Sequence, residues 1–158
     1  MDRAVESALR FLSLTSSGLL AGSLGFGDKA LIPGWEEERD RERRSPDLLP
    51  GKYFNAIGPI ALASSMTLAV GANRQGAVRR TLDVVSSLAL AGVLAATVFV
   101  TVPINKRLDT MTPADYPRDD HESMQKYWGR AHTLRTALGI SAFVCAVLSN
   151  VSRPSARP

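Results

Sequence analysis

The fold of this protein is decided where its last long apolar segment begins, with the sequence WGRAHTLR at residues 128–135. As a helix, this stretch places Trp128, His132 and Arg135 on one stripe, because residues four and seven positions apart share a helical face. The segment that follows, up to Leu148, is uncharged. A cation at the position of Arg135 is energetically unfavourable inside a membrane unless a polar group faces it. We therefore expect other segments to supply polar partners.

Charges elsewhere in the chain are gathered in two blocks, Asp28 to Lys52 and Lys106 to Arg130. Around these blocks lie four apolar segments of about 17 to 25 residues, the length that crosses a hydrocarbon layer about 30 Å thick. The pattern predicts an all-α integral membrane protein whose helices form an up-down-up-down four-helix bundle. The expected spans are residues 8–26, 55–72, 81–104 and 128–148.

The four spans are expected to form one domain, residues 1–152, followed by a disordered tail at 153–158. The first span could also be a signal peptide, since basic residues flank a short apolar run. A retained helix is favoured by its small residues, because these let membrane helices approach closely. The small residues expected on this contact face are Gly18, Gly22 and Gly25, with Ser17 and Ser23.

Composition limits the classes of partner. The formal net charge is +4, but basic residues are mixed with acidic ones and no basic, aromatic face suited to nucleic acid is seen. Lysine and arginine beside membrane spans explain the excess charge. The single cysteine, Cys145, lies in the last apolar segment and cannot form an internal disulfide. We expect it to pack as a small apolar residue.

Three acidic features have explanations simpler than a metal site, a partner site or a proton relay. The charged loop at residues 36–44 is typical of a short solvated helix with charge pairs. The cluster at residues 119–122, Asp-Asp-His-Glu, resembles the usual acidic start of a helix, and adjacent loop residues seldom converge on one ion. Asp83 lies close to the start of the third span and is interpreted as an end-capping charge within reach of water or of Arg79 and Arg80, rather than as a proton relay. No metal site is predicted.

The predicted topology brings the ends of spans one and three to the same side as the starts of spans two and four. On this side the stripe could line a cavity for an aromatic, hydrogen-bonding ligand, with His132 as acid or base and Arg135 stabilising an enolate or phenolate oxygen. Alternatively, His132 and Arg135 reach the lipid headgroups and Trp128 anchors the interface. The polar residues placed on this side are Asp28, Asn55, Asn105, Arg107, Trp128, His132 and Arg135.

The chain resembles the anthrone oxygenase-like family of small four-helix membrane proteins. The resemblance rests on a glycine-rich first span, on the sequence PINKRL at residues 103–108 and on WGRAHTLR at 128–135. It implies an oxygenase that acts with O₂ on a polycyclic aromatic substrate and converts an anthrone to an anthraquinone. The residues that match the family's pattern are Asn105, Trp128, His132 and Arg135.

The expected reaction requires no cofactor, because an anthrone has an acidic methylene whose carbanion could give an electron to O₂ directly. The catalytic candidates are His132 as base, with Arg135 and Asn105 as oxyanion donors. The candidates for substrate binding are Trp128, Asn55 and Arg107. Haem ligation by His132 is an alternative. His121 is the only other histidine and is expected in a loop, so two haem ligands would require one histidine from each subunit of an oligomer.

The expected partners are a small aromatic hydrophobic substrate and the lipid bilayer, with no nucleic acid. The glycines of the first span could equally serve a homo-oligomer. The competing function is a non-catalytic membrane module that binds haem, lipid or a partner helix. For orientation, we expect a multi-pass protein with both termini in the cytoplasm, because short arginine-containing segments lie on the terminal side.

Overall fold

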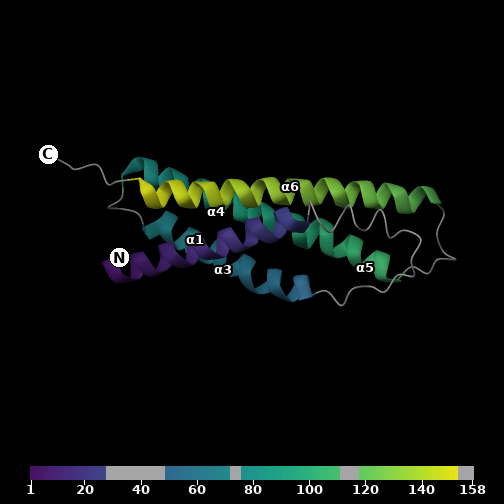
Figure 1. Ribbon diagram of the computed structural model, residues 1–158, viewed down its shortest axis with the longest axis horizontal. Helices are drawn as coiled ribbons and strands as arrows, with labels where there is room; N and C mark the ends of the chain where they lie inside the picture. Colours follow the sequence, from purple (N-terminus) through teal and green to yellow (C-terminus); the bar gives the residue numbers. More distant parts are fainter. Residues whose placement is uncertain (28–48, 72–75, 111–117, 153–158) are drawn as a thin grey trace.

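A computed structural model describes residues 1–27, 49–71, 76–110 and 118–152, and these residues are helical almost throughout (Figure 1). The third apolar segment is one continuous helix in three parts, because α4, the π-helix η3 and α5 follow each other without a break. The described part of the chain thus has four long helical segments. The elements are α1 (Arg3–Phe26), α3 (Leu49–Gly71), α4 (Ala77–Ala96), η3 (Thr97–Thr101), α5 (Val102–Thr110) and α6 (Arg118–Val151).

The all-α prediction is confirmed, although all four helical segments are longer than the apolar segments that predicted them, the third and fourth by the most. The third helix continues through Pro103 to Thr110, and α6 begins at Arg118 rather than at Trp128. Proline within a helix removes one backbone donor, and adjustment of a neighbouring turn can accommodate this loss. A helix can continue into polar sequence beyond its apolar part. Hydropathy detects only the apolar part, so it predicts helices that are too short.

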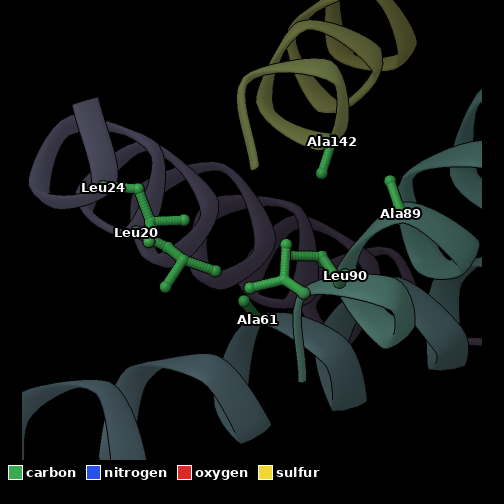
Figure 2. Packing of buried hydrophobic residues seen from close by; sticks show 7 residues of the cluster. Leu20, Leu24, Ala61, Ala89, Leu90 and Ala142 are labelled. Carbon is green, nitrogen blue, oxygen red and sulfur yellow. The ribbon is translucent and has the colours of Figure 1, made fainter. Parts of the chain in front are cut away.

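The core lies where the four segments meet. Helix α1 packs against α3 and α6, and α4 packs against the same two helices. Leu20 and Leu24 of α1 project towards Leu90 of α4 (Figure 2). Alanines from the surrounding helices complete the cluster, and their small side chains allow close approach of the helices. These alanines are Ala61, Ala89 and Ala142.

The contact face of α1 differs from the predicted glycine face. An added Cβ atom at Gly18 would lie 3.0 Å from the Phe143 ring, so this glycine does permit a close contact. At Gly22 and Gly25 such an atom would meet no described side chain or neighbouring helix within 4 Å. The prediction is therefore wrong for these two glycines. Ser17, also expected on this face, is buried as predicted, and α1 buries two further serines, Ser13 and Ser16.

Asp83 is buried, with only 4% of its surface exposed, so its interpretation as an end-capping charge is wrong. Ser149 of α6 donates a 2.6 Å hydrogen bond to one carboxylate oxygen, and Arg10 Nη2 of α1 lies 3.6 Å from the other. Arg10 Nη1 also donates to Ser149 Oγ at 3.1 Å. Arg79 donates to the Ser149 carbonyl rather than to Asp83. A buried polar cluster therefore joins α1, α4 and α6.

Two of the helices are long and apolar enough to cross a membrane, judged by length and composition. They are Ala77–Arg107, with a mean hydropathy of 2.2, and Lys126–Val151, with a mean hydropathy of 1.6. Residues Ala56–Gly71 of α3 form a shorter apolar helix. The two long helices are those that carry the candidate site residues Asn105, His132 and Arg135.

Candidate functional site

The aromatic part of the predicted stripe forms as expected on α6. Trp128 and His132 are one helical turn apart, and their rings stack with centroids 5.2 Å apart and an angle of 7° between the planes. Stacking follows from the spacing, since residues four apart lie above one another on a helix. The indole thus covers one face of the imidazole.

His132 is buried and faces the end of α1. Its Nε2 atom lies 3.2 Å from the carbonyl oxygen of Leu24, which also accepts a 3.4 Å hydrogen bond from Thr136. A carbonyl oxygen can only accept, so Nε2 of His132 must carry a hydrogen. In the neutral ring the basic lone pair is then on Nδ1. Gly27 makes this contact feasible, because a Cβ atom there would lie 3.2 Å from the imidazole.

Arg135 points into the interior, as the stripe predicted, with 5% of its surface exposed. Its Nη1 atom donates a 3.0 Å hydrogen bond to Thr101 Oγ1 of η3. Its guanidinium carbon lies 5.8 Å from the ring centroid of Phe54 on α3. Among the described residues, its Nε has no hydrogen-bond partner and no carboxylate pairs with it. The alternative in which Arg135 reaches lipid headgroups does not fit this burial.

Asn105 lies near the outer end of the stripe and is exposed. The indole Nε1 of Trp128 donates a 3.1 Å hydrogen bond to Asn105 Oδ1. Because an indole nitrogen is only a donor, the amide oxygen must face Trp128 and the amide nitrogen must point elsewhere. The predicted proximity of Asn105 and Trp128 is confirmed, and the side-chain NH₂ is left to donate.

Arg107 lies apart from the buried stripe, on the wall of a groove of about 460 Å³ between α5 and the start of α6. The groove is mostly apolar, and its lining includes Ile104 and Tyr127, the residues that precede Asn105 and Trp128 in the chain. None of Asn105, Trp128, His132 and Arg135 lines it. Its lining residues are Pro103, Ile104, Arg107, Ser123, Met124 and Tyr127.

Several predicted features fall outside what the structure describes. Asn55 is part of α3 and residues 119–122, with His121, are part of α6, but their side chains are outside the described set. Asp28, the charged loop at 36–44 and the tail at 153–158 lie outside the described residues altogether.

Sequence reasoning missed three groups at this site: the Thr101 hydroxyl, the Phe54 ring and the Leu24 carbonyl. Thr101 could have been found, because it lies four residues before Asn105 and would share its helical face. Phe54 lies next to Asn55, a residue already placed on this side. A main-chain carbonyl such as that of Leu24 leaves no signal in the sequence.

Comparison with known families gives one match. The family model described as anthrone oxygenase matches residues 51–145, which is more than half of the chain. The matched range contains Phe54, Thr101, Asn105, His132 and Arg135. No curated protein and no solved structure matches the chain.

Proposed function

This chain belongs to the anthrone oxygenase family, and on that premise we propose that it is a membrane oxygenase that converts an anthrone-type substrate to the anthraquinone with O₂. The observation that carries the proposal is a buried arginine without a carboxylate partner among the described residues, one turn from a buried histidine. Such a pair suits a reaction in which a proton leaves a carbon atom and negative charge develops on oxygen.

His132 acts as the base through Nδ1. Its Nε2–H is committed to the Leu24 carbonyl, so the methylene proton of the anthrone is taken by the other ring nitrogen. The Leu24 carbonyl lies at the C-terminal end of α1, where a helix carries partial negative charge, and this charge favours the imidazolium that forms. Thus the contact orients the ring and also stabilises the product of proton transfer.

Arg135 and Asn105 stabilise the enolate oxygen. The donors assigned to the enolate oxygen are the Arg135 Nε–H and the Asn105 side-chain NH₂. The guanidinium has the larger effect because it is charged and buried, where the dielectric constant is low. The electron-rich carbanion then reduces O₂. Overall, the methylene loses two hydrogen atoms and gains one oxygen atom, while the second oxygen atom leaves as water, so the reaction balances without a cofactor.

The substrate approaches from the groove beside Arg107. The groove's apolar walls suit fused aromatic rings, and Arg107 suits a phenolic oxygen. Because the Trp128 indole covers His132, a substrate that reaches the base displaces this indole or takes its place in the stack. Trp128 therefore acts in substrate binding, and Asn55 of α3 is assigned the same role.

The protein crosses the membrane with all four helical segments, as an up-down-up-down bundle with both termini in the cytoplasm. Support comes from the direction of α1. Near its start, Met1 lies beside Gly71 at the end of α3 and Arg10 bonds to Ser149 at the end of α6, whereas Gly27 after its end lies beside His132, so α1 runs antiparallel to both helices. Large apolar side chains such as Phe99 (77% exposed) and Val70 (76% exposed) face outwards, where lipid would cover them.

This arrangement predicts the result of a reporter fused to the C-terminus. A reporter that is active only in the cytoplasm should be active there, and one that is active only outside it should be inactive. A second fusion at the loop of residues 111–117 should give the opposite result, because an odd number of crossings separates the two sites. Equal reporter activity at both sites would contradict the four-span topology.

Oxygen uptake tests the proposed reaction. Protein purified in detergent and incubated with an anthrone under air should consume O₂ and form the quinone, one molecule of O₂ for each quinone. Spontaneous oxidation is measured with the Arg135→Ala variant, which lacks the main oxyanion donor. Equal rates for the wild type and this variant would reject the enzyme and favour a non-catalytic membrane module.

A further inference from the structure

We propose that Thr101 is a positioning residue that holds the Arg135 guanidinium so that its Nε–H faces the reacting oxygen. This inference rests on the proposed function, in which Arg135 stabilises the enolate. It starts from the 3.0 Å hydrogen bond from Arg135 Nη1 to Thr101 Oγ1. Both residues are buried, Thr101 with 6% and Arg135 with 5% of its surface exposed, so water does not compete for this contact.

A hydroxyl is well suited to this task because it accepts a hydrogen bond without carrying charge. A carboxylate in its place would fix the guanidinium equally well, but it would also neutralise the positive charge on which oxyanion stabilisation depends. On another side, the Phe54 ring lies 5.8 Å from the guanidinium carbon. Thr101 and Phe54 therefore restrict the guanidinium and leave the Nε–H edge for a ligand.

Thr101 itself is fixed by its own helix. Its Oγ1 donates a 3.4 Å hydrogen bond to the Ala96 carbonyl, five residues earlier, while it accepts from Arg135. A hydroxyl that both donates and accepts is restricted to one orientation. The Arg135 contact is thus held by a side chain that has little freedom to rotate.

The π-helix η3 brings Thr101 to this position. Val102 N–H bonds to the Thr97 carbonyl, five residues earlier, which is the π-type spacing. Thr101 is eight residues after Val93. In an uninterrupted α-helix each residue adds about 100°, so Thr101 would be about two full turns plus about 80° on, and would face about 80° away from Val93. In the structure both are buried, Val93 with 2% of its surface exposed. The wider turn therefore returns Thr101 to the interior face, opposite α6.

The test compares Thr101→Val, which removes only the hydroxyl, with Thr101→Ser, which retains it. The matched control is Thr97→Val, because Thr97 is in the same π-helix and, among the described residues, its hydroxyl bonds only to the Val93 carbonyl of its own helix. For Thr101→Val we expect kcat for anthrone oxidation to fall about 10- to 100-fold, with KM changed less than about threefold, since a misdirected donor weakens the transition state more than substrate binding. Thr101→Ser and Thr97→Val should remain within about threefold of wild type.

Two outcomes of these rates would overturn the inference. A Thr101→Val enzyme with wild-type kcat would show that the hydroxyl does not position Arg135. Equal losses in Thr101→Val and Thr97→Val would show that the π-helix matters only as a structural element.

A second measurement is independent of turnover and so separates this inference from the proposed function. The ¹⁵N signals of the Arg135 side chain, assigned by their loss in Arg135→Lys, report rotation of the guanidinium. We expect distinct Nη signals in the wild type and averaged signals in Thr101→Val, because the hydrogen bond hinders rotation. Averaged signals in both proteins would overturn the inference. If the wild type lacks oxygenase activity but shows the expected difference, only the proposed function fails.

Discussion

Replacement of His132 by Gln is expected to lower kcat for anthrone oxidation by about 10² to 10⁴-fold, the usual contribution of a general base. Glutamine can place an amide N–H near the position of Nε2 and so keep the hydrogen bond to the Leu24 carbonyl, but it has no basic nitrogen at the position of Nδ1. The protein should therefore fold and bind substrate while proton transfer fails. Initial rates of quinone formation measure the effect.

Thr136→Val is the matched control for this variant. Thr136 donates to the same Leu24 carbonyl but offers no base, so its replacement should leave kcat within about threefold of wild type. The kcat of the wild type should depend strongly on pH, whereas the residual rate of His132→Gln should not. If His132→Gln retains full activity, the base is another group and the assignment of Nδ1 is wrong.

Replacement of Asp83 by Ala is expected to destabilise the protein by about 3–5 kcal/mol, because it removes the buried counter-charge of the Arg10 guanidinium and leaves only the partly exposed Glu6 to pair with it. Ser149 loses its 2.6 Å hydrogen-bond acceptor in the same variant. The contacts between α1, α4 and α6 at this end of the bundle depend on these groups. Chemical denaturation in detergent, followed by circular dichroism, measures the loss.

Two further variants show whether the loss comes from an uncompensated charge. Glu6 also pairs with Arg10, at 3.0 Å, but it is partly exposed, so Glu6→Gln should cost no more than about 0.5 kcal/mol. The double variant Arg10→Met with Asp83→Leu removes both charges and should recover most of the stability lost in Asp83→Ala. If the double variant is as unstable as Asp83→Ala, the carboxylate stabilises the bundle in some way other than by pairing with Arg10.

The residues of the candidate site were largely predictable because they depend on local spacing. Trp128 and His132 stack because they are one helical turn apart, and Arg135 follows on the same face. Asn105 was placed beside them by the alternation of the apolar segments, and its hydrogen bond with Trp128 agrees with that placement. These predictions needed only the period of the helix and the order of the segments.

The errors have a different origin. Asp83 was assigned to its nearest basic neighbours in the sequence, whereas its partners come from two other helices, α1 and α6. Gly22 and Gly25 were assigned to a contact because they are small, but the rotation of α1 turns Leu20 and Leu24 towards the other helices instead, together with Ser17, which was predicted on this face. Composition alone does not determine how far a helix is rotated about its axis.

By itself, the sequence determined the helical class and the stripe of Trp128, His132 and Arg135, because both follow from residue periodicity along one chain segment. Only the tertiary structure decided which atoms these side chains meet. The Leu24 carbonyl sets the His132 tautomer, and the Thr101 hydroxyl sets the direction of Arg135. Both contacts join distant segments, and the second depends on a single π-turn, so helix packing and rotation had to be known first.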